Sequence, residues 1–321
     1  MSLRDEVLGC LLEAGDAYVS GGQMAEKLKV SRTAIWKVMD QLKAEGAEIE
    51  STSRLGYRLV SPPDLFHEGQ FLSLVKDCSI SWKPQYFEEL DSTNNVAKSL
   101  AANGAPEGTV IISDHQTAGK GRLGKQFHSP QGGLYFSAIL RPKLPLNDMM
   151  AVTACAASAV FNALQEFGIT AEIKWVNDLF LNDRKICGIL SEGSFNAETL
   201  SMDYLIIGIG INLHHDPHLP DELQAIVTDL ETETGQKLPR FALCAAVLRN
   251  LETLIAGIPD HTFLPIYTEH CMTIGRKVCV QAKNGETIAT AIGIAEDAGL
   301  IVALEDGSQE TIRTGSAVFV D

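Results

Sequence analysis

Apolar residues in the first sixty positions recur with the period of short α-helices and then with that of a β-hairpin. Leucines and a valine within residues 3–15 fall three or four positions apart, which predicts a first helix. Ser20 and Ser31 precede two further runs of this kind and are expected to cap a second and a third helix. Residues 49–60 alternate as a hairpin. This succession predicts a winged helix-turn-helix domain at residues 1–62.

The middle of the chain mixes longer helical patterns with short, almost wholly apolar runs. Pro62 and Pro63 separate it from the first domain and stiffen the link. The helical patterns cover residues 65–76, 95–103, 148–167 and 239–256, and the strand-like runs cover residues 84–90, 110–112, 134–140, 173–181, 185–192 and 204–213. Such a mixture predicts a central mixed α/β domain over residues 65–270.

Residues 273–321 change to short alternating strands separated by turn residues. The strand runs are residues 278–280, 287–294, 300–304, 310–312 and 317–320. Asn284-Gly285 and Asp306-Gly307 are turn signals between them. This pattern predicts a small C-terminal β-barrel of SH3-like size. The predicted fold class is therefore α+β and multidomain, with a winged helix-turn-helix, a central mixed α/β domain and an SH3-like barrel.

Composition narrows the class of protein. The 321 residues are 45% hydrophobic and 21% charged, the balance of a soluble globular protein, and no run reaches the roughly 18 apolar residues of a membrane span. The start of the chain lacks the apolar core of a secretory signal, so we expect a cytoplasmic protein without a membrane partner. Seven scattered cysteines form no C-x-x-C pair and fit reduced thiols.

Charge is distributed unevenly along the chain. The net charge of −15 argues against a general nucleic-acid binder. Residues 1–60 carry eight Lys/Arg and nine Asp/Glu, a net charge of −1, which leaves −14 for the remainder. The cations of this part gather on the third predicted helix and on the hairpin. The predicted DNA-contacting residues are Ser31, Arg32, Thr33, Lys37, Arg54 and Arg58. The alternative is a helical packing module with solvated charges, but the clustering favours DNA.

A loop at residues 116–133, between two predicted strands, interleaves glycines with cations. Its first part contains Gly119, Lys120, Gly121, Arg122, Gly124 and Lys125. Free backbone amides and fixed cations suit an anion such as phosphate or carboxylate. The glycine spacing also fits dinucleotide-binding and Walker A loops, but those open a helix, whereas a strand follows here. Taken alone, the loop fits an ordinary surface loop as well as it fits an anion site.

Its context decides between these alternatives. Four stretches stand in the order found in one family: DSTN at 91–94, QTAGKGRLGK at 116–125, KWVND at 174–178 and RKICGIL at 184–190. With the winged helix, the chain resembles biotin–protein ligases over nearly its whole length. It is most similar to the bifunctional bacterial type, in which the ligase is also the biotin-operon repressor.

The resemblance implies a reaction and its partners. ATP, with Mg²⁺, would convert biotin to biotinyl-5′-adenylate, and a lysine of the biotin carboxyl carrier protein of acetyl-CoA carboxylase would then displace AMP. The N-terminal domain would bind operator DNA, and the protein would be a homodimer because a symmetric operator has two half-sites.

The resemblance also implies residue roles. Biotin would contact Ser92, Thr93, Asn94, Gln116, Lys120, Gly121, Arg122 and Lys185. ATP and the adenylate would contact Lys120, Arg122, Lys125, Asn177, Asp178 and Asn212. Arg122 and Lys185 would be the catalytic residues, and Asp178 would hold Mg²⁺. For Ser92 and Thr93, capping of the helix that starts there is an alternative that is compatible with ligand binding.

Two positions depart from the family pattern. Lys120 stands where Arg is usual and lacks the bidentate guanidinium, and Val176 stands where Pro is usual. Neither change removes an essential charge. The alternatives left open are a biotin-sensing repressor with impaired ligase activity, a ligase whose N-terminal domain no longer binds DNA, and a lipoate-type ligase, although the Gly-Lys-Gly-Arg loop and the Lys185 segment argue against the last.

Overall fold

The computed structural model describes residues 3–144, 148–196, 201–282 and 285–320. The chain forms two compact units, Met1–Lys76 and Asp77–Asp321. Within the described residues, no helix combines the length and the apolar character needed to cross a membrane. The domain limits expected from the sequence stay predictions.

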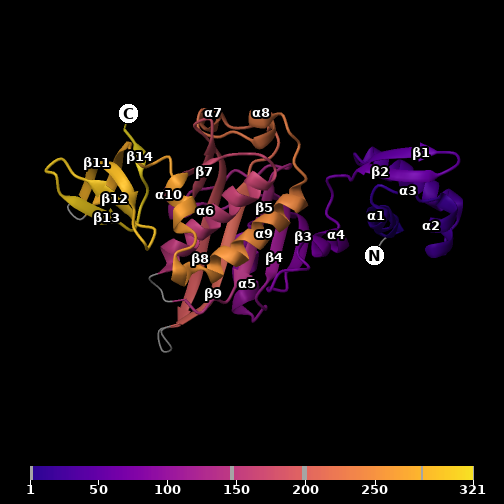
Figure 1. The fold of residues 1–321 in the computed structure, drawn as a ribbon, viewed down its shortest axis with the longest axis horizontal. Coiled ribbons are helices and arrows are strands. Elements are labelled where there is room, and N and C mark those ends of the chain that lie inside the picture. The colour runs from indigo at the N-terminus through magenta and orange to yellow at the C-terminus, as the bar shows by residue number, and fades with distance from the viewer. Residues whose placement is uncertain (1–2, 145–147, 197–200, 283–284, 321) are drawn as a thin grey trace. The chain divides into compact units, whose positions relative to one another are not determined.

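The first unit contains the predicted helices and hairpin (Figure 1). Its elements are α1 (Leu3–Ala14), α2 (Gly21–Lys27), α3 (Arg32–Ala44), β1 (Glu48–Thr52), β2 (Gly56–Ser61) and α4 (Glu68–Leu74). Ser20 accepts a hydrogen bond from the Gln23 amide in a full capping box, and Ser31 accepts one from the Ala34 amide. Both predicted caps are therefore confirmed.

The hairpin is fastened to the loop before α2. Val19 and Tyr57 exchange backbone hydrogen bonds of 2.8 and 2.9 Å. Gly56 adopts a φ of +103°, and a Cβ built on it would lie 2.2 Å from the Val19 carbonyl oxygen. Glycine is required here by both conformation and space. The helical core beneath is apolar, with Val7, Ile35 and other side chains fully buried.

A sheet of seven strands organises the second unit. Its strands are β3 (Lys83–Leu90), β4 (Thr109–Gln116), β5 (Leu134–Leu140), β6 (Glu172–Lys174), β7 (Asp178–Leu181), β8 (Arg184–Asn196) and β9 (Ser201–Ile211). The order is β3-β4-β5-β9-β8-β7-β6, in which β3 and β4 are parallel and the remaining neighbours antiparallel.

The single strand predicted over residues 173–181 is wrong. The chain turns at residues 175–177, so that β6 and β7 pair with each other. Side chains at the turn find partners away from the sheet ladder: the Trp175 indole donates to the Ala298 carbonyl oxygen at 3.0 Å. The peptide bond between Trp175 and Val176 is cis.

Six α-helices within the described residues accompany the sheet (Figure 1). They are α5 (Thr93–Ala102), α6 (Met149–Glu166), α7 (Asp221–Gln224), α8 (Leu230–Thr234), α9 (Arg240–Ala256) and α10 (Leu264–Glu269). Of these, α5, α6 and α9 pack against its strands. α6 and α9 pack along each other. α5 places Ala97 and Ala101 against Ile111, Ile139 and Ile206 of the sheet, and small side chains let helix and sheet approach closely.

The C-terminal strands form a five-stranded antiparallel sheet. They are β10 (Lys277–Ala282), β11 (Gly285–Ile294), β12 (Leu300–Ala303), β13 (Gln309–Ile312) and β14 (Val318–Phe319), in the order β13-β12-β11-β10-β14. This agrees with the predicted SH3-like domain. Asn284, of one predicted turn, lies outside the described residues.

Candidate active site

The second unit contains a cavity of about 400 Å³ at the ends of β4, β8 and β9. All of the residues predicted to contact biotin or the adenylate line it: Ser92, Thr93, Asn94, Gln116, Lys120, Gly121, Arg122, Lys125, Asn177, Asp178, Lys185 and Asn212. Residues far apart in the sequence are thus gathered around one space. Their individual roles remain predictions.

One end of the cavity is lined by the neutral groups of Thr93, Asn94 and Gln116, which are hydrogen-bonded to each other and to serines behind them. The Thr93 amide donates to Gln116 Oε1 at 2.8 Å, and Gln116 Nε2 donates to Ser129 Oγ at 2.8 Å. Ser137 Oγ donates to Asn94 Oδ1 at 2.6 Å. All of these side chains are at least nine-tenths buried. This end can therefore recognise a polar, uncharged group.

Ser92 has the position of a helix cap but not its hydrogen bond. Ser92 occupies the N-cap position of α5, but its side chain forms no capping hydrogen bond. The residue is 1% exposed and lines the cavity. Asp91 instead accepts a hydrogen bond of 2.6 Å from Asn95 Nδ2.

Cations border another part of the cavity. Arg122 is half-buried, and its Nη1 donates to Asn177 Oδ1 at 3.1 Å. Burial lowers the pKa of its guanidinium, while the Asp178 carboxylate opposes that shift. Lys185 Nζ lies 2.7 Å from Asp178 Oδ1. The polar residues that interrupt apolar strands here are thus satisfied by one another, in an arrangement that also presents positive charge to an anion.

The cationic loop is held by its own backbone. The Gly121 amide donates to the Lys125 carbonyl oxygen at 2.8 Å, and the Phe127 amide donates to the Gly119 carbonyl oxygen at 2.9 Å. Only a short 3₁₀ turn, Arg122–Gly124, forms between these bonds. The loop therefore does not open a helix, which agrees with the rejection of the dinucleotide and Walker A motifs.

Phe127 was not foreseen as a site residue. Its ring lines the cavity and rests on a cross-strand pair of glycines, Gly188 of β8 and Gly210 of β9. A Cβ at Gly188 would lie 2.7 Å from Phe127 Cε2, and one at Gly210 would lie 2.5 Å from Cε1. Glycines at alternate positions of a buried strand were the available signal.

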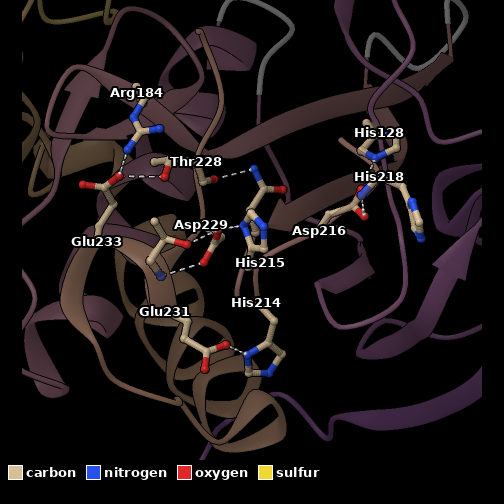
Figure 2. Close-up of polar contacts among 12 residues, drawn as sticks. His128, Arg184, His214, His215, Asp216, His218, Thr228, Asp229, Glu231 and Glu233 are labelled. Atoms are coloured by element: carbon tan, nitrogen blue, oxygen red, sulfur yellow. Dashed lines mark hydrogen bonds and ion pairs between the residues drawn. The ribbon is translucent and has the colours of Figure 1, made fainter. Parts of the chain in front are cut away.

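A histidine-rich segment after β9 also lines the cavity and was not foreseen (Figure 2). His128 Nε2 lies 2.8 Å from Asp216 Oδ2, and His214 Nδ1 lies 2.9 Å from Glu231 Oε2. In the same view Glu233 accepts hydrogen bonds from Arg184 and Thr228. The segment has no periodic pattern of its own, so its sequence indicates no element.

The predicted DNA-contacting residues differ in their solvent exposure and in the contacts of their side chains. Arg32, Thr33, Lys37 and Arg54 are exposed. Ser31 is exposed, but its hydroxyl caps α3. Arg58 forms an ion pair of 2.8 Å with Glu50, and its guanidinium lies 5.2 Å from the centre of the Tyr18 ring. Arg58 is therefore engaged within the first unit, and its contact with DNA stays a prediction.

Comparison with known proteins matches both units. A model of the biotin/lipoate A/B protein ligase family matches residues 86–212, and a model of a helix-turn-helix domain matches residues 4–58. Over 312 residues the chain is 36% identical to the bifunctional ligase/repressor BirA of Bacillus subtilis (strain 168), and the match covers 95% of each chain. The chain belongs to the BirA family.

A second relative and a solved structure are also similar to the chain over about three quarters of its length. The BirA of Escherichia coli (strain K12) is 29% identical over 246 residues, which are 76% of this chain and 74% of that one. The structure of biotin protein ligase from Aquifex aeolicus in complex with biotin and ATP is similar with a TM-score of 0.62 and 28% identity, covering 74% of this chain and 97% of that chain. The second unit thus has the fold of a BirA-family ligase.

Proposed function

We propose that this BirA-family protein uses ATP to activate biotin as biotinyl-5′-adenylate and transfers the biotinyl group to a lysine of a biotin carboxyl carrier protein. One observation carries the proposal: a single cavity joins a neutral hydrogen-bonding end to a cationic border formed by the glycine-rich loop and Lys185. Biotin has matching ends, a neutral cyclic urea and a carboxylate. The dithiolane ring of lipoate has no N–H or carbonyl group that could form hydrogen bonds with the neutral groups at that end of the cavity.

The chain's residues act mainly by positioning and by electrostatics. In the first step the biotin carboxylate attacks the α-phosphate, and pyrophosphate leaves. In the second, the lysine amine attacks the acyl carbon, and AMP leaves. Negative charge moves between phosphate and carboxyl oxygens in both, so Arg122 and Lys185 at fixed positions stabilise it. Lys120 and Lys125 add charge from the loop, while Asn177 and Asn212 supply amide contacts to the nucleotide.

The site suits a Mg²⁺ ion that is bound mainly by the nucleotide. Within the described parts of the chain, no three or more His, Cys, Asp or Glu side chains are grouped to hold a metal. Mg²⁺ that accompanies a nucleotide commonly takes one or two protein carboxylates besides phosphate oxygens and water. Asp178, which lines the cavity, is the carboxylate we assign to it. The ion would neutralise charge on the triphosphate.

The first unit supports a second activity, repression at operator DNA. Arg32, Thr33 and Lys37 lie exposed on the N-terminal part of α3, which in such domains enters the major groove. We propose that a homodimer presents two such helices to a symmetric operator. Because ATP, carrier protein and operator are cytoplasmic, we expect the protein there.

Calorimetric titration of biotin, alone and with MgATP, tests the enzymatic proposal when it is followed by mass spectrometry of the bound species. We expect binding and a bound biotinyl-adenylate. The matched variants are Arg122→Ala, which should slow adenylate formation, and Lys143→Ala, an exposed lysine outside the cavity, which should not. Biotin binding without adenylate would identify a sensor, and no binding would refute the proposal.

A further inference from the structure

Trp36 of α3 is the most exposed of the three tryptophans of the chain. Its relative exposure is 55%, whereas Trp82 and Trp175 are 2% and 3% exposed. Single exposed apolar side chains are common on soluble proteins, so exposure alone indicates no function. What distinguishes Trp36 is its place, because it lies on the helix that we expect to enter the major groove of DNA.

The packing of the first unit leaves the Trp36 side chain outside the core. α3 buries Ile35, Val38, Met39 and Leu42, and it packs against α1, α2 and β1. These four positions form one apolar face of the helix. Trp36 lies outside that face and is presented to solvent.

The exposed stripe that contains Trp36 is suited to contact with bases. Thr33, Trp36, Lys37 and Asp40 are exposed and stand at i, i+3, i+4 and i+7, so they follow one side of α3. In helix-turn-helix domains it is the second helix, here α3, whose side chains contact base edges. A carboxylate such as that of Asp40 is repelled by phosphates but can accept a hydrogen bond from the cytosine amino group. The stripe therefore fits base edges better than the sugar-phosphate backbone.

Cations beside Trp36 make DNA the occupant that fits this surface. The ion pairs described in the first unit join other residues, so the charges of Arg32 and Lys37 are not neutralised there. Arg32 lies over α2, where a Cβ built at Gly22 would come within 2.9 Å of its Nη2. Uncompensated cations attract a polyanion and disfavour an apolar protein surface.

The indole group can make two kinds of contact in the major groove. The C5-methyl group of thymine is the apolar surface that the groove presents, and an exposed aromatic ring loses contact with water when it packs on that group. The indole N–H donates and does not accept, so it matches an acceptor such as purine N7 or thymine O4. Within the described residues, the N–H of Trp36 has no hydrogen-bond partner.

We propose that Trp36 is a specificity-determining residue for operator DNA: its ring packs on a thymine methyl group in the major groove of each half-site. This inference rests on the DNA-binding role proposed for the first unit and deepens it. It adds an apolar reader of sequence to a set of expected contacts that is otherwise polar or charged.

The first experiment removes the methyl group from the DNA and leaves the protein unaltered. Full-length protein with biotin and MgATP selects duplexes from a pool with a randomised centre, and thymines of one half-site are then replaced singly by deoxyuridine. Deoxyuridine lacks the C5-methyl group and pairs as thymine does. We expect one replacement to weaken binding about four-fold, as measured by fluorescence anisotropy, which is the effect of one buried methyl group.

The second experiment removes the indole. Trp36→Ala should bind the selected duplex roughly ten-fold more weakly and a scrambled duplex at most about two-fold more weakly, with an unchanged dependence on salt because no charge is lost. The deoxyuridine replacement should have no further effect in Trp36→Ala. Trp36→Phe keeps a ring and should remain sensitive to the methyl group. Leu72→Ala is the matched control, since Leu72 is an exposed apolar residue of the same unit on α4.

Tryptophan fluorescence reports the contact directly. Because Trp82 and Trp175 are buried, acrylamide should quench mainly Trp36 in the free protein. The selected duplex should protect this fluorescence from quenching, and the scrambled duplex should protect it less. Equal protection by both duplexes would contradict a sequence-specific contact.

Three further results would overturn the inference. They are equal weakening of the selected and the scrambled duplex by Trp36→Ala, a deoxyuridine effect that persists in Trp36→Ala, and the lack of any sensitive thymine. Weaker self-association of Trp36→Ala without DNA, measured by sedimentation, would assign the residue to a contact between copies instead. Thermal melting shows whether a variant is folded, and the deoxyuridine series needs no variant. If the unaltered protein selects no sequence from the pool, the proposed repressor role is what fails.

Discussion

Replacing Gly208 by alanine tests how tightly the neutral end of the cavity is built. The added Cβ would lie 1.8 Å from Asn94 Oδ1 and 2.7 Å from Asn94 Cγ, far inside van der Waals contact. The Asn94 side chain cannot simply rotate away, since it is hydrogen-bonded to Glu192 and Ser137. We expect either β9 to shift or Asn94 to leave its place.

Either response lowers the free energy of unfolding. Overpacking of a well-packed core costs about 1–3 kcal/mol, and each lost hydrogen bond adds about 1 kcal/mol, so Gly208→Ala should lower the free energy of unfolding by about 2–4 kcal/mol. Biotin affinity should fall with it, because Asn94 lines the cavity.

The assays are urea denaturation followed by circular dichroism, and calorimetric titration of biotin. Gly293 of β11 is a matched control: the nearest atom to a Cβ there is 3.8 Å away, so Gly293→Ala should have little effect on either measurement. If Gly208→Ala retains both its stability and its biotin affinity, the packing described around Asn94 cannot be correct.

Three other predictions concern separate parts of the chain. Arg122→Ala should slow biotinyl-adenylate formation on the order of a hundred-fold and release more of the intermediate, as quench-flow and mass spectrometry would detect; an unchanged rate would refute its assigned role. Arg32→Ala should weaken binding to duplex DNA, lower the slope of the logarithm of the binding constant against the logarithm of salt concentration by about 1, and leave ligation unchanged. Arg58→Ala should chiefly lower the melting temperature. Loss of both DNA binding and ligation in Arg32→Ala would contradict the assignment of the two activities to separate units. Hydrogen bonds, first of all the one from Thr228, lower the pKa of Glu233 below its ordinary value of 4.5. The ionised carboxylate therefore stabilises the fold above pH 4.5, and this contribution is lost as the pH falls through the lowered pKa. Glu233→Gln should flatten the acid side of the curve of unfolding free energy against pH, and an unchanged curve would contradict the role given to Glu233.

Periodicity predicted most of the fold because buried faces repeat regularly. The run at Leu134–Leu140 is a strand with the predicted bounds, and its seven residues are all buried. The failure at residues 173–181 has the opposite cause. The turn there contains Trp175 and Val176, which are buried and apolar like the strands on either side. Without glycine or proline to mark it, the pattern cannot distinguish one strand from two.

The sequence predicted many of the residues that line the cavity, because most of them occur in short motifs, but it missed Phe127 and the histidine-rich segment after β9. It also did not indicate the hydrogen bonds that join lining residues to residues outside the lining. Glu192 and Asn94 are 98 positions apart, and nothing in either local sequence relates them. For Ser92 the sequence left capping and ligand binding both open, and the structure places the residue at the N-cap of α5 without a capping hydrogen bond from its side chain.

Phe127 lies where the neutral and the cationic part of the cavity meet. Its carbonyl oxygen accepts a hydrogen bond of 3.0 Å from Ser129 Oγ, which belongs to the neutral network through Gln116. Its ring lies 5.6 Å from Lys185 Nζ, on the cationic side. One residue therefore contacts both parts of the cavity, through its main chain on the neutral side and through its ring on the cationic side.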